Sequence, residues 1–106
     1  MNPMADENNN ICMRIHVDQG HRLLAACDKD ILGKEFKENE VHLKVSEMFY
    51  KDEEVDQDTF LRFLRTVDMA NLVGEIVVSA AIEAGFIDSE FVIRIEGIPH
   101  AQLCSM

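Results

Sequence analysis

The stretch 68-DMANLVGEIVVSAAIEAG-85 contains the most apolar run of the chain, Leu72 to Ile82. Its apolar side chains recur at intervals of three and four residues, which is the spacing of one face of an α-helix. Gly85 fits the position just after a helix, where a left-handed backbone is favoured. The pattern therefore predicts a largely buried helix from about Asp68 to Ala84.

A second, shorter helix is predicted just before this stretch. Phe60, Leu61, Leu64 and Val67 recur at helical spacing and leave the other positions polar. The acidic residues of the segment 51–58 precede this helix, and Asp56 or Asp58 can cap its N-terminus. We prefer this interpretation over the alternative that the acidic segment docks a basic partner.

The remaining apolar segments show the two-residue alternation of half-buried strands. Ile11 to Val17 is the clearest, and turn residues after it predict a hairpin with the next strand. The predicted strands are residues 11–17, 22–27, 41–45, 91–95 and 101–104. Because strands precede and follow the helices, we expect an α+β fold: a mainly antiparallel sheet of about five strands with two principal helices packed on one face.

Length and composition point to one domain. The chain has 106 residues, of which 47% are hydrophobic and 28% charged, values typical of a single folded core. Residues 1–10 are polar and we expect them to form a disordered tail, with residues 11–106 as a single α+β domain. Gly74, Glu75 and Ser79 interrupt the most apolar run, which is too short to span a membrane.

The three cysteines indicate the compartment. Cys12, Cys27 and Cys104 are an odd number without CxxC spacing, and each lies in or beside an apolar segment. We therefore expect buried free thiols, which are typical of a reducing compartment. The first residues also lack the pattern of a signal peptide, so we expect a cytoplasmic protein. A zinc site would need a fourth ligand such as His100.

The net charge of −10 argues against indiscriminate binding to nucleic acid or membranes. Acidic residues are nevertheless concentrated in the segment 35–58, and the predicted strands carry cations. If the apolar alternates face inward, five basic or titratable side chains fall on the opposite face of one sheet. They are Arg14, His16, His42, Lys44 and Arg94. Such a face can contact phosphate or acidic groups, although the alternative is an ordinary solvated face with cross-strand ion pairs.

A polar corner near the C-terminus is the second candidate site. Pro99 restrains the backbone, and His100 and Gln102 are two residues apart on a strand, so both project from one face. The same groups could instead satisfy backbone donors at a corner of the sheet. Asn71 and Gly74 raise a similar question, because a buried amide needs partners and glycine allows close backbone approach. We expect Asn71 to bond to the 99–102 segment.

No common catalytic motif is present, whether of the nucleotide-binding, metalloprotease or hydrolase type. We therefore expect no cofactor and no metal, and a non-enzymatic role is favoured. The alternative is a small metal-dependent or Cys/His enzyme centred on His100, with Cys27 or Cys104 as the nucleophile. A third alternative is a homodimer joined through Val78 and Ile82.

In combination and order, three segments resemble an uncharacterised conserved family of archaeal proteins, the domain-of-unknown-function family four-two-four. They are Cys27-Asp-Lys-Asp-Ile-Leu-Gly-Lys34 with Phe36, Asn71-Leu-Val-Gly74 with Glu75 and Val77, and Gly97-Ile-Pro-His-Ala-Gln102. The resemblance covers nearly all of the chain after residue 10 and adds Asp28 and Lys34 to the candidate binding residues. Position 98 is Ile where the pattern implies Val, a conservative exchange.

No established activity comes with this resemblance. It implies an archaeal, cytoplasmic protein loosely associated with translation. We therefore expect a binding module whose partners are RNA or ribosome-associated proteins, with no membrane contact and with homo-oligomers as an open question.

Overall fold

The computed structural model describes residues 8–104, which form two sheets and three short α-helices. The helices are α2 (Glu47–Tyr50), α3 (Gln57–Leu64) and α4 (Glu75–Glu83). The strands are β1 (Ile11–Asp18), β2 (His21–Asp28), β3 (Glu35–Glu38), β4 (Val41–Lys44), β5 (Glu53–Val55), β6 (Met69–Val73), β7 (Ile93–Ile95) and β8 (Ile98–Cys104).

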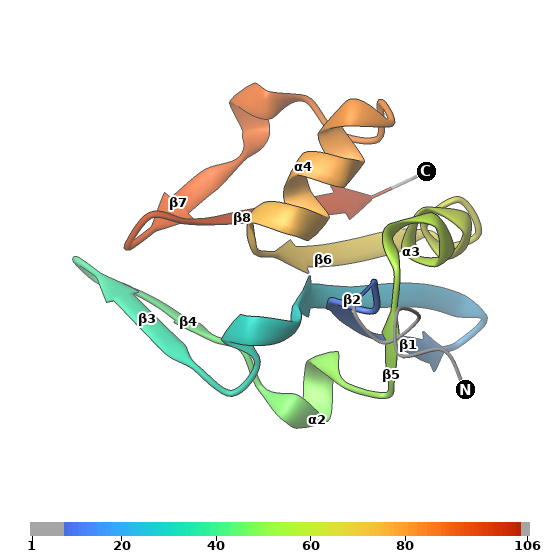
Figure 1. Ribbon diagram of the computed structural model, residues 1–106, viewed down its shortest axis with the longest axis horizontal. Coiled ribbons are helices and arrows are strands. Elements are labelled where there is room, and N and C mark those ends of the chain that lie inside the picture. Colours follow the sequence, from blue (N-terminus) through green and yellow to red (C-terminus); the bar gives the residue numbers. More distant parts are fainter. Residues whose placement is uncertain (1–7, 105–106) are drawn as a thin grey trace.

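The main sheet has six strands in the order β5-β1-β2-β6-β8-β7 (Figure 1). Its pairs are antiparallel except for β2 and β6, which run parallel. The predicted α+β class is confirmed, but the sheet is mixed and larger than the five strands expected. β5 was missed because its three residues lie within the acidic segment, where no apolar alternation marks a strand.

The first hairpin forms as predicted. β1 and β2 pair over their whole length, from Ile11 with Asp28 to Asp18 with His21. Gln19 and Gly20 close the turn with φ of 52° and 80°, the left-handed pair that a two-residue hairpin turn requires. Residues 1–7 of the predicted disordered tail lie outside the described residues. At its end, the carbonyl of Asn10 accepts a hydrogen bond of 2.8 Å from the N–H of Lys29 and so continues the ladder.

The single helix predicted over 68–84 is wrong, because its first part is strand β6 and only the second part is helix α4. β6 lies between β2 and β8 and has apolar residues on both faces, so its sequence shows no regular alternation of apolar and polar residues. Gly74, with φ of 119° and ψ of 156°, separates the strand from the helix. Gly85 follows α4 with φ of 84°, as predicted.

The shorter predicted helix is confirmed as α3. Asp56 is its N-cap residue, and the Asp56 carboxylate accepts a bond of 2.9 Å from the N–H of Thr59. The neighbouring acid Glu54 pairs with Lys29 at 3.0 Å. Two acids of the segment are therefore used for local capping and pairing.

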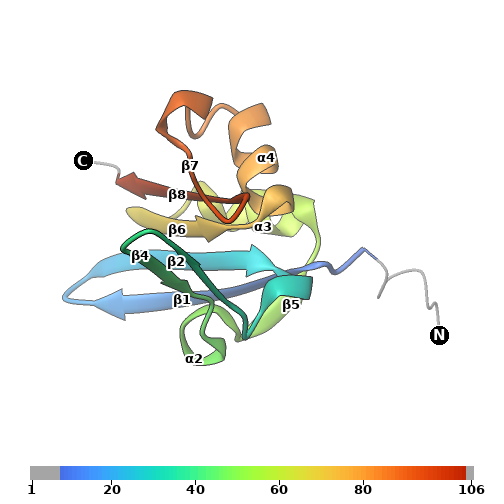
Figure 2. The same cartoon turned by 90° about the vertical axis from the view of Figure 1, so that its left-hand side faces the viewer.

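Helices α3 and α4 both pack on one face of the main sheet, as expected. Their buried side chains, such as Phe60 and Val77, form one core with Leu24 and Leu72. The second face is only partly covered, by the β3–β4 hairpin, α2 and the 3₁₀ turn Lys29–Ile31, as Figure 2 shows for the hairpin. That second core contains Cys12, Ala25, Cys27, Ile31, Leu43, Val45, Tyr50, Val73 and Ile95.

The strand predicted at 41–45 exists as β4, but it pairs with β3 in a separate two-stranded sheet. This hairpin reaches the β7–β8 turn, where the N–H of Lys37 donates to Glu96 and the N–H of Glu96 donates to Glu38. The charged sequence of β3 hid its strand character. The hairpin therefore covers one end of the second face of the main sheet and leaves the other end open.

Two predictions about the C-terminal part need correction. Phe91 belongs to a 3₁₀ turn (Ser89–Phe91) and is 74% exposed, while Ile93 on β7 is 53% exposed. Of the three predicted inward residues, only Ile95 is buried. The strand pattern failed here because β7 is at the edge of the sheet, where one face lacks a covering layer.

Two of the three cysteines are buried free thiols, as expected, whereas Cys104 is exposed. Burial raises the pKa of both the Cys12 and Cys27 thiols. We therefore expect one thiol per native chain to react rapidly with a disulfide reagent at pH 8, and three after denaturation. A Cys104→Ser variant should abolish the rapid reaction. More than one rapidly reacting thiol in the native protein would contradict this arrangement.

Within residues 8–104, no helix is long and apolar enough to cross a membrane.

Candidate functional site

A row of four residues crosses the second sheet face, one from each central strand, and its Ala25 is fully buried in the second core. The register places Arg14 of β1 opposite Ala25 of β2, Ala25 beside Asn71 of β6, and Asn71 opposite Gln102 of β8. Side chains at paired positions share a face, so these residues lie on one line across the sheet. We call this set the polar row.

The two amides of the polar row bond to each other. The Nε2 of Gln102 donates to the Oδ1 of Asn71 at 2.9 Å, which confirms the expected bond between Asn71 and the 99–102 segment. One donor group on Asn71 and one acceptor on Gln102 remain, since the contact uses a single atom of each amide. Gln102 is exposed and Asn71 half-buried, so both remaining groups can meet a ligand.

Arg14 completes the row at its β1 end. Its side chain is exposed, and within residues 8–104 its guanidinium forms neither an ion pair nor a hydrogen bond. Its five donors are therefore free for a ligand.

His100 lies on the same face as Gln102, as predicted, one row nearer the covered end. Its register partner on β7 is Ile93. Burial lowers the pKa of the His100 imidazole, which favours the neutral ring at neutral pH. None of the described residues bonds to this ring, so it can both donate and accept a hydrogen bond.

Two shallow hollows flank Gln102. One, of about 300 Å³, is lined by Phe91, Ile93, His100, Ala101 and Gln102. The other, of about 360 Å³, is lined by Leu23, Met69, Ala70, Asn71, Gln102, Leu103 and Cys104. The polar row is thus bordered by apolar side chains on both sides.

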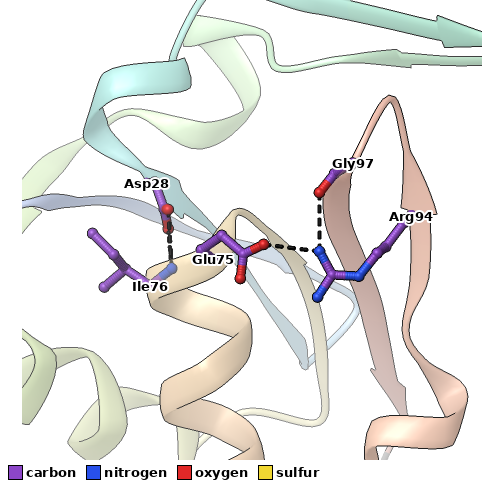
Figure 3. A network of polar contacts seen from close by, with 5 residues as sticks. All are labelled: Asp28, Glu75, Ile76, Arg94 and Gly97. Carbon is purple, nitrogen blue, oxygen red and sulfur yellow. Dashed lines mark hydrogen bonds and ion pairs between the residues drawn. The ribbon is translucent and has the colours of Figure 1, made fainter.

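The predicted basic face is wrong as a single surface. His42 and Lys44 lie on β4 in the separate hairpin, and His42 contacts Glu35 at 2.7 Å. Arg94 pairs with Pro99 in the register and contacts Glu75 at 2.8 Å on the helical side (Figure 3). The alternation of residues along a strand does not show which sheet the strand joins. The five predicted residues therefore lie on different surfaces and form no single basic patch.

Only two of the five residues of the predicted basic face share the open face. His16 of β1 lies one row beyond Arg14 and has an intramolecular role. Its ring stacks on Phe49 at 4.6 Å between centroids, and its Nε2 lies 2.8 Å from the Phe49 carbonyl. This contact fixes α2 against β1. Of these two residues, Arg14 is therefore the one whose side chain has no partner among residues 8–104.

Asp28 and Gly74, both candidate binding residues, are instead structural partners. Asp28 is 5% exposed, and its carboxylate accepts from the N–H of Ile76 at 3.0 and 3.1 Å (Figure 3) and from the N–H of Val77 at 3.1 Å. It therefore caps α4, whereas at the 3₁₀ turn that directly follows it no side-chain cap bond forms. Gly74 leaves room for this carboxylate.

The last two candidates have backbone roles. Pro99 is buried, and its carbonyl accepts from the N–H of Gly74 at 2.9 Å. Lys34 bonds through its backbone to Ile31 and Val45 and leaves an exposed side chain outside the polar row. Among the residues predicted for the C-terminal corner, the structure brings together Asn71, His100 and Gln102.

A catalytic pair centred on His100 does not form. Val73 lies between Cys27 and His100 in the register, so these two residues are two strand spacings, about 10 Å, apart. Cys104 is four positions along β8, or about 13 Å away. Among residues 8–104, no three His, Cys, Asp or Glu side chains gather as a metal site requires.

The predicted dimer contact also needs correction. Val78 is 2% exposed and belongs to the core between α4 and the sheet, and Ile82 packs against the same core. Both residues are used within one chain. Because α4 is apolar on most of its surface, its sequence did not show which side chains would pack against the sheet.

Sequence reasoning missed part of the open site. Leu23 and Met69 border the polar row, and Phe91 and Ile93 are exposed beside His100. Their apolar character predicted burial, so no sequence signal distinguished them from core residues. Arg14 was found, but as part of a larger patch.

Taken together, the fold and site define a class: an α+β domain with helices on one face and a half-open sheet on the other. Residues 15–106 match the family model described as "Protein of unknown function (DUF424)", so the chain belongs to this family. The resemblance inferred from the sequence is thereby confirmed.

A solved structure supports the same relationship. The chain is similar to the crystal structure of an uncharacterized conserved protein from Methanopyrus kandleri, with a TM-score of 0.74 and 25% sequence identity. The match covers 91% of this chain and 93% of that one. A comparison with curated proteins gives no match.

Proposed function

We propose that this protein is a non-enzymatic binding module that holds a short unpaired RNA segment on the open face of its main sheet. The observation that supports this most directly is the polar row, in which a free guanidinium and a bonded amide pair lie on one sheet face, on either side of the buried Ala25. Single-stranded RNA is commonly bound on the open face of a sheet whose other face carries helices.

Each group of the site matches a part of such a ligand. The guanidinium of Arg14 can contact a phosphate or stack on a base, and the amides of Asn71 and Gln102 can bond to base edges. The neutral ring of His100 and the exposed ring of Phe91 offer stacking surfaces. Their arrangement favours two or three bases, because the row spans only four strands.

The charge of the protein limits this interaction in a testable way. With a net charge of −10, the chain repels an RNA backbone in general, and within the described residues Arg14 is the single free cation on the row. We therefore expect a weak dependence on salt, with a slope of about −0.7 in log affinity against log salt for one phosphate contact. The proposal includes the expected cytoplasmic location, since buried free thiols are typical of a reducing compartment. It also includes the association with translation that the family resemblance implies.

Fluorescence anisotropy with labelled hexanucleotides of A, C or U tests the proposal. We expect binding to at least one of them, weakened about tenfold or more by Arg14→Gln and by Asn71→Leu. Lys44→Gln is the matched control, because it removes the same charge from the separate hairpin and should change affinity less than twofold. Equal losses in the Arg14 and Lys44 variants, or no binding at millimolar protein, would contradict an RNA site on this face.

A further inference from the structure

The outer edge of β8 is incompletely paired. β7 pairs with β8 only from Ile98 to His100, whereas β8 continues to Cys104. On its inner side, β8 pairs with β6 as far as Cys104. The last part of β8 therefore has a strand on one side only within the described residues.

The backbone groups that face this free side can be identified. The carbonyl of Pro99 accepts from the N–H of Gly74, directly after β6, so the polar groups of Pro99 point toward β6. Residues along an antiparallel strand alternate in direction, and those of Gln102 and Cys104 therefore point away from β6. No described backbone group bonds to them.

The chain itself keeps this edge open. An extension of β7 by two residues would place Phe91 opposite Gln102, but residues Ser89–Phe91 turn away as a 3₁₀ turn. Two backbone bonds close that turn, from Phe91 to Asp88 at 3.0 Å and from Val92 to Ser89 at 3.2 Å. The result is the hollow of about 300 Å³ between Phe91 and Gln102.

The opposite edge of the sheet is charged. β5 is three residues long and pairs only with residues 11–13 of β1, and its Glu54 pairs with Lys29 at 3.0 Å and with Lys51 at 3.7 Å. The rest of the β1 edge, which no described strand covers, carries Arg14 and Asp18. Short, charged edge strands resist further pairing. At the β8 edge, no residue from Ala101 to Cys104 is charged or a proline, so that protection is missing.

We propose that the outer edge of β8 receives an extended, basic polypeptide segment as an added strand. Its backbone would bond to Gln102 and Cys104, and its apolar side chains would cover Phe91 and Ile93, which are 74% and 53% exposed. A basic partner matches the net charge of −10 and the two acids that lead into Phe91, Asp88 and Glu90. This surface uses backbone groups at an edge, but it shares Phe91 with the proposed RNA site, so peptide and RNA should compete for that side chain.

Amide hydrogen exchange followed by NMR, with the peptide (Lys-Val)₃ as the probe, tests this proposal on the full chain. In the free protein, the Gln102 amide should exchange rapidly, while the amides of Ala101 and Leu103, which face β6, are protected. Saturating peptide should slow exchange at Gln102 at least tenfold. Protection of Gln102 before peptide is added, or unchanged exchange with peptide, would overturn the proposal.

Two controls separate backbone pairing from other contacts. A (Lys-Val)₃ peptide with an N-methyl group on every residue has no N–H on either edge, cannot form the ladder and should fail to protect Gln102, as should (Glu-Val)₃ on grounds of charge. In the protein, Gln102→Pro removes the outward N–H and should weaken binding at least tenfold, whereas Gln102→Ala should change it less than threefold. The N-methyl control needs no variant, so it decides the matter even if Gln102→Pro fails to fold.

Three further outcomes would each decide for or against strand addition at the β8 edge or RNA binding on the face. If sedimentation shows a dimer in which Gln102 is already protected, a second copy occupies the edge and the proposal is wrong. Equal binding of the methylated and unmethylated peptides would likewise exclude strand addition. RNA binding that fails while Gln102 is protected by (Lys-Val)₃ would remove the proposed function and leave this inference intact.

Discussion

Replacement of Gly74 by alanine should destabilise the protein by about 2–6 kcal/mol, a large part of the stability of a domain of this size. Gly74 has φ of 119° and ψ of 156°, a region that side chains other than glycine avoid. A Cβ at this position would also overlap the Asp28 carboxylate, with Oδ2 only 2.7 Å away. Because that carboxylate is buried and bonded to α4, it cannot move without loss. Urea unfolding followed by circular dichroism measures the effect.

Gly85→Ala is the matched control for this prediction. Gly85 also has a left-handed φ, of 84°, but apart from its chain neighbours no atom lies within 4 Å of the position that a Cβ would take. Its replacement should therefore cost only the backbone penalty of about 1–2 kcal/mol. Equal losses of stability in the Gly74 and Gly85 variants would show that contact with Asp28 contributes nothing. The double variant Gly74→Ala with Asp28→Ala should be less destabilised than the sum of the two single variants, because they share one contact.

Asp28→Ala should destabilise the fold by about 2–4 kcal/mol, since it leaves the N–H groups of Ile76 and Val77 without their acceptor at the buried start of α4. Asp28→Asn keeps an acceptor oxygen and should cost less than the alanine variant. Asp30→Ala is the control, because Asp30 is an exposed acid two residues away and should have an effect within about 0.5 kcal/mol. An Asp28→Ala protein as stable as the Asp30→Ala protein would contradict the capping role.

The same residue predicts a dependence on pH. Burial raises the pKa of the Asp28 carboxyl, although its bonds to the N–H groups of Ile76 and Val77 oppose the shift. The folded protein therefore holds this proton more tightly than the unfolded chain does. The contribution of Asp28 to stability is full below the unfolded pKa, about 3.9, and falls as pH rises through the raised folded pKa. The difference in unfolding free energy between the native protein and Asp28→Asn should show this fall, because the other titrating groups, Glu35, Glu54 and Asp56 among them, are common to both proteins.

The candidate site divides into parts that the sequence could and could not predict. His100 and Gln102 were found because two positions on one strand share a face, and the bond from Gln102 to Asn71 was expected from the cost of an unpaired amide. The basic face was predicted by the same parity and failed. Parity assigns a side chain to a face of its own strand, but it does not say which sheet the strand joins, and β4 joins a separate hairpin.

The helix predicted over residues 68–84 failed for a related reason. Its apolar run has helical spacing. For a segment as short as Met69 to Val73, periodicity does not distinguish a buried helix from a buried strand. The neighbours β2 and β8 make this segment a strand, because they supply backbone partners on both sides. Gly74 marks the boundary, but its meaning depends on Asp28, which lies far earlier in the chain and fills the space that a side chain would need.

The sequence by itself determined the α+β class, the first hairpin, helix α3 with an acidic cap at Asp56 or Asp58, the end of α4 at Gly85 and the family. These features depend on local patterns: alternation, helical spacing, caps, turns and short motifs. Only the tertiary structure decided the order of the six strands, the cap that Asp28 provides to α4, the dispersal of the cations and the open face with its free β8 edge. Those features depend on contacts between residues far apart in the chain, where many pairings satisfy the same local pattern and the packing of the whole chain selects one.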